Sequence, residues 1–203
     1  MKLTPEFYDR ENVVQISKDL LGKFLFTSFK GQFTGGMITE TEAYEGVIDK
    51  ASHAYGNRRT NRTEIMYAKG GTAYVYLCYG IHSLFNVVTN NEGTPHAVLI
   101  RAIQPLYGIE TILERRKQTK LIPNLTVGPG KVSEALGIHY SDTGKSLSGD
   151  EIWIEDKGIR VPEKDIIVGP RVGVDYAGDH ALWPYRFILK PEYVKSLNLE
   201  ISY

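Results

Sequence analysis

Near its beginning the chain changes from a helical to an extended spacing of apolar residues. Between Glu11 and Leu21 the apolar side chains recur at helical intervals, and Gly22 then favours the end of a helix. Residues 24–29 and 37–44 are typical of strands, and a turn-like Lys30-Gly31-Gln32 lies between them. The pattern therefore predicts a helix followed by two strands.

The clearest extended segment is residues 72–88, where tyrosine and cysteine side chains alternate with smaller aliphatic ones. Tyr74, Tyr76 and Cys78 fall on one face of a strand, and smaller aliphatic residues fall on the other. Tyr79-Gly80 interrupts the alternation, after which the apolar run resumes. This arrangement predicts a β-hairpin whose tip carries Tyr79.

The rest of the chain continues with strands separated by a few helices. We expect a helix start at Thr4-Pro5, a strand at 97–103, a helix at 107–117, a short helix after Gly130, and strands near 152–154, 172–174 and 186–189. Runs of strands with few helices favour an α+β fold. The prediction is a single domain over residues 1–203, with a curved, mostly antiparallel sheet flanked by helices and a protruding β-hairpin.

Composition limits the class of protein. The 203 residues are 42% hydrophobic and 11% aromatic, enough for a folded core. The sequence shows neither the apolar region of a signal peptide nor an apolar run of the roughly 18 residues that span a membrane. Cys78 is the single cysteine, so an internal disulfide is excluded and a reducing compartment is expected. These features predict a cytoplasmic protein without contact to a membrane.

The formal net charge is zero, but the charges are distributed unevenly. Residues 50–131 hold 11 lysines and arginines and 4 acidic residues, whereas the remainder holds 13 basic and 20 acidic residues. A basic segment in a neutral chain can present a positive face to an anion. The fold can equally interleave these charges with acidic ones, and composition does not decide between the two.

Several kinds of chemistry find no support in the motifs. The five histidines are scattered and no cysteine pair exists, so we predict neither a metal site nor a cofactor. A Gly-x-Ser-x-Gly elbow is also missing. A lone Cys78 within a strand is typical of packing rather than of a nucleophile. Gly128-Pro129-Gly130-Lys131 lacks the spacing of a nucleotide-binding loop, and it is either a turn or a site for a single phosphate.

The segment around Glu42 is more informative. In a strand, Glu40, Glu42 and Tyr44 share one face, although acidic residues are costly to bury. Taken alone, this face fits an exposed edge strand. Together with His53 and the tyrosines of the hairpin it also fits a pocket for a planar base, with a carboxylate at the edge of that base.

A polar loop follows, and it contains Arg58, Arg59 and Arg62. Guanidinium groups bind phosphate oxygens well, and Lys131 adds a further cation downstream. The loop therefore fits either a contact with a nucleic-acid backbone or a merely solvated segment.

The order of the motifs resembles that of the alkyladenine (3-methyladenine, methylpurine) DNA glycosylases, from about Leu20 to about Leu189. The resemblance rests on Thr41-Glu42-Ala43-Tyr44, His53, Gly71-Thr72-Ala73-Tyr74-Val75-Tyr76, Tyr79-Gly80, Asn86, Leu99-Ile100-Arg101-Ala102 and Arg171-Val172-Gly173-Val174. Each motif is short, but the ordered series is specific.

The resemblance implies a role for each matching residue. Glu42 corresponds to the general base that activates water, and Arg101 and the backbone carbonyl of Val172 correspond to groups that hold this water and the carboxylate. The walls that sandwich the flipped base correspond to Tyr44, His53 and Tyr76, with His53 also contacting the sugar-phosphate. Tyr79 corresponds to a wedge inserted into the DNA, and Asn86 to a pocket residue that discourages guanine.

The implied activity is monofunctional excision of damaged purines from double-stranded DNA by a monomeric bacterial enzyme. An extruded base and an oxocarbenium-like sugar suit an aromatic wedge and one carboxylate. No lysine matches a nucleophile, so no strand cleavage is expected. His82 and Ser83 replace bulkier residues of mammalian relatives, and residues 89–96 form a slightly longer segment. The alternatives are a non-catalytic DNA-binding module and, less well supported, a hydrolase of free nucleosides.

Overall fold

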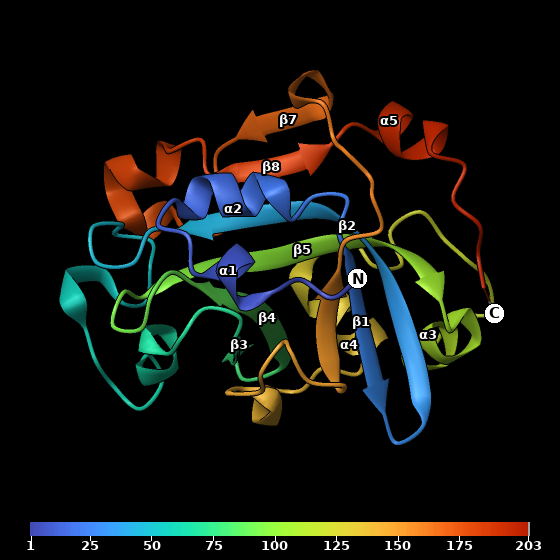
Figure 1. The fold of residues 1–203 in the computed structure, drawn as a ribbon, viewed down its shortest axis with the longest axis horizontal. Helices are drawn as coiled ribbons and strands as arrows, with labels where there is room; N and C mark the ends of the chain where they lie inside the picture. The colour runs from blue at the N-terminus through green and yellow to red at the C-terminus, as the bar shows by residue number, and fades with distance from the viewer. Residues whose placement is uncertain (203) are drawn as a thin grey trace.

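A sheet of eight strands organises residues 1–202, the part of the chain that the computed structural model describes (Figure 1). The strands are β1 (Phe24–Phe29), β2 (Gln32–Tyr44), β3 (Ala73–Cys78), β4 (His82–Thr89), β5 (His96–Tyr107), β6 (Ile152–Glu155), β7 (Ile166–Gly169) and β8 (Arg186–Leu189). Six of them follow the order β3-β4-β5-β2-β1-β6, and β8 joins β2 to β7. Each strand ladder is antiparallel, which confirms the predicted α+β class.

Short helices flank this sheet. They are α1 (Pro5–Tyr8), α2 (Val13–Asp19), α3 (Ile109–Arg115), α4 (Pro129–Leu136) and α5 (Pro191–Ser196), with 3₁₀ turns η1 (Tyr55–Asn57), η2 (Glu64–Tyr67), η3 (Tyr140–Asp142), η4 (Glu163–Asp165) and η5 (Asp175–Leu182). In Figure 1, α2 lies in front of β2, and α4 lies behind β1 and β6. The predicted helix at 11–21 is shorter and runs from Val13 to Asp19. It begins at Val13 because the Asn12 side chain caps it by accepting from the Gln15 N–H at 2.9 Å. None of the helices in residues 1–202 is long and apolar enough to cross a membrane.

Strand β2 is the central element because it pairs with three neighbours. It pairs with β5 along most of its length, with β1 through its first half, and with β8 at residues 40–42. The register against β5 shifts near Gly35 and again on both sides of Glu40. Bulges of this kind bend a strand and redirect its side chains. Glu42 consequently lies between Leu99 of β5 and Arg186 of β8, rather than on an open edge.

The sequence places the start of β2 at Met37, but the strand begins at Gln32. Lys30 and Gly31 form a two-residue turn with φ of 52° and 79°, the backbone conformation that tight hairpins require. The strand then runs through Gly35 and Gly36, which weaken the strand pattern in the sequence. A Cβ at Gly36 would lie 2.3 Å from the backbone oxygen of Gln104, so glycine is needed there for the close approach of β5.

Substitution of Gly36 by alanine is expected to destabilise the fold by about 1–3 kcal/mol, because the backbone of β5 must move to admit the methyl group. Urea unfolding of the two proteins measures the difference. Gly169→Ala is the matched control, since Gly169 also lies in a strand and has no neighbouring atom within 4 Å of the added Cβ. Equal midpoints for Gly36→Ala and Gly169→Ala would contradict the close-packing argument.

The prediction of a strand at 172–174 is wrong. The strand in this region is β7, and Val172 to Val174 form an irregular connection to η5. Gly173 has a φ of 75°, which an extended strand does not allow, and the Val172 N–H bonds a side-chain carboxylate instead of a neighbouring strand. The apolar Val-Gly-Val pattern therefore arises from a loop that faces a cavity.

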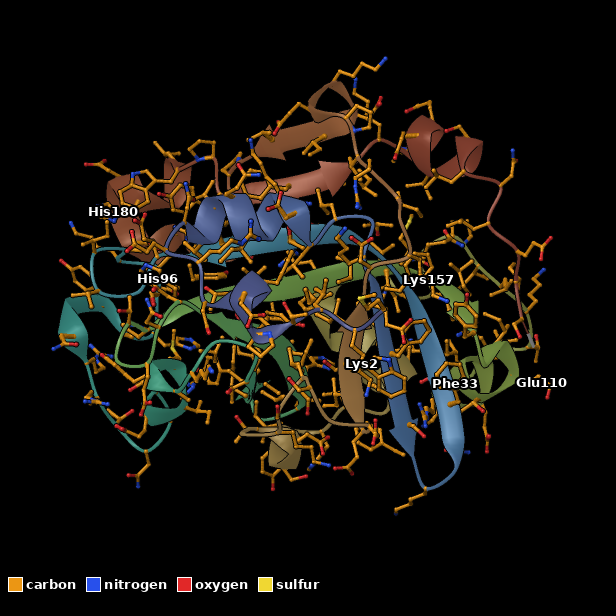
Figure 2. The ribbon with its side chains drawn as sticks, viewed as in Figure 1. Lys2, Phe33, His96, Glu110, Lys157 and His180 are labelled. Atoms are coloured by element: carbon orange, nitrogen blue, oxygen red, sulfur yellow. The ribbon has the colours of Figure 1, made fainter. Side chains whose placement is uncertain are left out.

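The two ends of the sheet carry different groups of side chains. Figure 2 shows Phe33 and Lys157 at one end, where Phe26, Tyr107 and Trp153 complete an aromatic cluster. His96 and His180 lie at the other end. There the Lys50 N–H donates to His180 Nδ1 at 3.1 Å, which joins the loop after β2 to η5. This second end contains the cavity described next.

Candidate active site

A cavity of about 270 Å³ opens where β2, the β3–β4 hairpin, β5 and the loop after β7 meet. Its lining is largely aromatic and aliphatic: Tyr44, Ala51, His53, Met66, Tyr74, Tyr76, Cys78, Tyr79, Leu84, Asn86, Ala97, Leu99, Arg101, Pro129, Val172, Gly173, Val174 and Tyr176. The predicted face of Tyr74, Tyr76 and Cys78 is confirmed, since all three line this cavity. Concave, mostly apolar sites with a few polar groups are typical of ligand binding.

Glu42 lies immediately behind this lining and is fully buried. Its Oε1 accepts the Val172 N–H at 2.8 Å and lies 3.4 Å from Nε of Arg101. Its Oε2 accepts the Tyr44 hydroxyl at 2.8 Å. The interpretation of this strand as an exposed edge is therefore wrong. Arg101 and Val172 lie beside Glu42 as the resemblance implies, although the Val172 group that touches the carboxylate is its N–H rather than its carbonyl. Tyr44, which the resemblance makes a wall for the base, also bonds this carboxylate.

A second carboxylate shares Arg101. Glu40 Oε1 accepts from Nε of Arg101 at 3.0 Å and from Nε of Arg186 at 2.7 Å. Because Arg186 balances Glu40, the charge of Arg101 remains available to Glu42. The sequence signal for Glu40 was the two-residue spacing from Glu42, whereas nothing in the sequence connects Arg186 with this group.

Burial dominates the protonation of Glu42. Removal from water raises the pKa of the Glu42 carboxyl, and Arg101, the Val172 N–H and the Tyr44 hydroxyl oppose this rise. A carboxyl with a raised pKa is a stronger base once it is ionised. The arrangement therefore suits acceptance of a proton by Glu42.

The activity of this site is expected to show an acid limb above pH 4.5, the ordinary pKa of glutamate. Only the carboxylate form accepts a proton, so the rate should fall as the pH drops through the raised pKa of Glu42. Single-turnover rates measured across pH test this expectation. A rate that stays constant down to pH 4.5 would contradict it.

His53 lines the same cavity, and its contacts fix its tautomer. Burial, followed by the charges of Arg62 and Arg58, lowers the pKa of His53 to about 4, so the ring is neutral at pH 7. Arg62 can only donate, and its Nη2 lies 3.5 Å from Nε2 of His53. Nε2 is therefore the acceptor, and Nδ1–H donates to the Tyr74 hydroxyl oxygen at 2.7 Å.

The aromatic rings do not form two parallel walls. His53 and Tyr76 meet edge to face, with centroids 4.7 Å apart and an interplanar angle of 79°. Arg62 covers the Tyr76 ring, 4.7 Å from its centroid. A flat ligand that stacks on Tyr76 would therefore meet His53 with its edge, unless one of the two rings turns.

Asn86 forms part of the buried floor. Its amide nitrogen lies 3.2 Å from the backbone oxygens of both Tyr74 and Leu84, so both of its hydrogens are engaged. The Oδ1 atom remains as an acceptor.

Of the remaining predicted residues, Tyr79 lines the cavity, whereas Arg59 and Lys131 line neighbouring depressions. Tyr79 is 91% exposed at the hairpin tip, and it also borders a neighbouring depression with Lys131 and Arg116. Arg59 pairs with Glu64 at 3.0 Å, and Arg116 pairs with Glu134. Arg58 is exposed, and its charge helps to lower the pKa of His53 after burial and Arg62. Lys131 thus lies in a depression that shares Tyr79 with the cavity, and part of the basic segment is neutralised within the protein.

Five residues near Glu42 had no role assigned from the sequence: Glu40, Asp49, Arg171, Tyr176 and Arg186. Arg171 directly precedes Val172, so its motif was visible although its contacts were not. Within residues 1–202, no three His, Cys, Asp or Glu side chains gather closely enough to hold a metal ion.

Comparison with known proteins identifies the class. A sequence model described as "Methylpurine-DNA glycosylase (MPG)" matches residues 6–193. A protein of Chlamydia felis named "Putative 3-methyladenine DNA glycosylase" is 46% identical over 188 residues, which cover 92% of this chain and 95% of the relative. Proteins with the same name from Chlamydia pneumoniae and Bacillus mycoides are each 45% identical, covering 94% and 92% of this chain and 96% and 95% of the relatives.

These matches place the chain among the DNA glycosylases, hydrolases that act on N-glycosyl bonds. More specifically, the chain belongs to the methylpurine-DNA glycosylase family, as the resemblance in its motifs implied.

Proposed function

We propose that this chain excises alkylated and deaminated purines from double-stranded DNA during base excision repair, with Glu42 as the general base. The observation that carries the proposal is the buried Glu42 carboxylate, held behind an aromatic cavity by Tyr44, Val172 and Arg101. A carboxylate so placed can reach a water molecule at the sugar of a base that occupies the cavity.

The proposed reaction is hydrolysis of the bond between the base and the sugar. Glu42 takes a proton from water, whose oxygen bonds to the anomeric carbon while the electron pair of the N-glycosidic bond leaves with the base. The oxocarbenium-like transition state is cationic, so the nearby carboxylate also stabilises it. Among residues 1–202 the cavity lining includes no lysine, which supports water rather than an amine as the nucleophile and an intact abasic strand as the product.

The lesions we propose as substrates are 3-methyladenine, 7-methylguanine, hypoxanthine and etheno-adenine. Alkylation at a ring nitrogen makes a purine cationic, so it leaves as a neutral base without an acid catalyst. Tyr44 and Tyr76 offer ring faces for stacking, which is worth about 1–3 kcal/mol per base. Hypoxanthine is neutral and requires hydrogen bonding or protonation to leave.

The proposal includes base flipping, because duplex DNA hides both the base and its glycosidic bond. Tyr79 at the exposed tip would fill the gap left by the extruded base, and the cations Arg58, Arg62 and Lys131 would contact the backbone on either side. We propose that the whole chain acts as one monomeric domain, in the cytoplasm and on the nucleoid of a bacterium.

The test is single-turnover release of base from duplexes that each carry one of the four lesions. Release with an intact abasic strand, revealed by cleavage only after alkali treatment, is the expected result. Strand cleavage without alkali would overturn water as the nucleophile. Retained binding of the lesion duplex with no release of any base would instead indicate a damage-binding module.

A further inference from the structure

The most completely buried ion pair near the site joins Asp49 and Arg171. Both side chains have no exposed surface, and the guanidinium is bidentate, with Nη1 on Oδ2 and Nη2 on Oδ1 at 2.9 Å. Neither residue lines the cavity. Burying two charges is costly unless their geometry and hydrogen bonds compensate, so such a pair calls for a specific reason.

Arg171 contacts both segments that hold the Glu42 carboxylate. Its Nη1 donates to the backbone oxygen of Ala43, and its guanidinium lies 4.8 Å from the centroid of the Tyr44 ring. Tyr44 supplies the hydroxyl on Oε2, and Val172, the residue after Arg171, supplies the N–H on Oε1.

A third contact fixes the loop from its other side. Nη2 of Arg171 donates to the backbone oxygen of His180 at 3.0 Å, and the guanidinium also lies 5.3 Å from the Tyr185 ring. The planar guanidinium of Arg171, which lies in the loop after β7, therefore connects this loop to β2 and to η5. Arginine suits this task because its donors have a rigid, fixed arrangement.

We propose that Asp49 and Arg171 form a positioning pair that orients the Tyr44 hydroxyl and the Val172 N–H and thereby sets the charge state and direction of Glu42. The pair touches no substrate and acts through these two groups. Its importance for catalysis rests on the proposed role of Glu42 as general base. Displacement of a catalytic group by about 1 Å can cost about 10²-fold in rate.

The pair also belongs to the electrostatic surroundings of Glu42. The groups that face Glu42 are Glu40 and Tyr44 on β2 and Arg101 on β5, with Arg186 of β8 balancing Glu40. Arg171 adds a cation whose charge Asp49 neutralises. Burial opposes the rise in the pKa of Arg171, which Asp49 mainly causes and to which Tyr44 and Glu42 contribute. Neutralising Asp49 therefore makes the net charge near Glu42 more positive, whereas neutralising Arg171 makes it more negative.

Two substitutions test the proposal by moving the pKa of Glu42 in opposite directions. Asp49→Asn leaves an unbalanced Arg171 cation, which stabilises the carboxylate and lowers the pKa of Glu42. Arg171→Met removes the cation and loosens the loop that positions the Val172 N–H. Both effects raise the pKa of Glu42. The readout is the carboxyl ¹³C shift of Glu42 followed across pH, together with single-turnover base release, which should fall about tenfold to a hundredfold in Arg171→Met.

The controls separate positioning from folding. Lys23→Met breaks the Lys23–Asp156 pair (2.8 Å), which lies in a different depression, and should leave the titration of Glu42 unchanged. If Arg171→Met fails to fold, Arg171→Lys takes its place, because it keeps the charge but not the bidentate fork. An unmoved Glu42 titration in both Asp49→Asn and the Arg171 variant would overturn the proposal. The titration decides this even if the unaltered protein releases no base, a result that would defeat only the proposed function.

Discussion

Replacing Glu42 with glutamine is expected to slow single-turnover base release by about 10²- to 10⁴-fold, the contribution typical of a positioned general base. Glutamine has the same size, and its oxygen can still accept the Val172 N–H and face Arg101, as Oε1 does. Its NH₂ group would face the Tyr44 oxygen, which can accept a hydrogen bond. The site should keep its shape and lose only the ability to take a proton.

A binding measurement distinguishes the loss of proton transfer in Glu42→Gln from a loss of structure. Glu42→Gln should bind a duplex with one damaged purine as tightly as the unaltered protein. Glu45→Gln is the matched control: it removes a carboxylate three positions along, one that accepts the Tyr185 hydroxyl at 2.6 Å. It should release base at close to the unaltered rate. Equal release by Glu42→Gln and the unaltered protein would show that another carboxylate is the base.

The elements that rely on local periodicity could be predicted from the sequence. The alternation in residues 72–88 predicted the hairpin and its tip correctly, because one face of the strand packs into the core and the other lines a cavity. Strand β1 was predicted at its observed bounds. Strand β2 was predicted too short, because the two glycines at Gly35 and Gly36 weaken the strand pattern while serving the close packing of neighbours.

The arrangement around Glu42 could be predicted only in part. The spacing of Glu40, Glu42 and Tyr44 indicated a shared face, but whether that face was exposed depended on β5 and β8 pairing on either side of it. The contact between Asp49 and Arg171 joins positions 122 residues apart, and no periodicity reports such a contact. The roles given to His53, Tyr76 and Asn86 came from the resemblance rather than from any pattern in the chain.

Replacing Tyr79 with glycine is expected to lower base release from duplex DNA about tenfold or more, while release from a single-stranded lesion stays nearly unchanged. The expected loss follows from stacking, since an aromatic ring against a base is worth about 1–3 kcal/mol and each 1.4 kcal/mol is about tenfold. If Tyr79 is the proposed wedge, only a duplex offers a gap for its ring to fill. Tyr140→Ala is the matched control, because Tyr140 is also exposed but lies in η3 outside the cavity lining.

The backbone at Tyr79 explains why glycine is the sharper substitution. Tyr79 has a φ of 51°, a left-handed conformation that costs a residue with a side chain about 1–2 kcal/mol. Glycine removes this strain but loses about 0.5–1 kcal/mol through the greater freedom of the unfolded chain. The two effects nearly cancel, so the Tm of Tyr79→Gly should match or slightly exceed that of the unaltered protein. Lower duplex activity at an undiminished Tm would indicate that the strained tyrosine serves DNA distortion rather than folding. Undiminished duplex activity would remove Tyr79 from the mechanism.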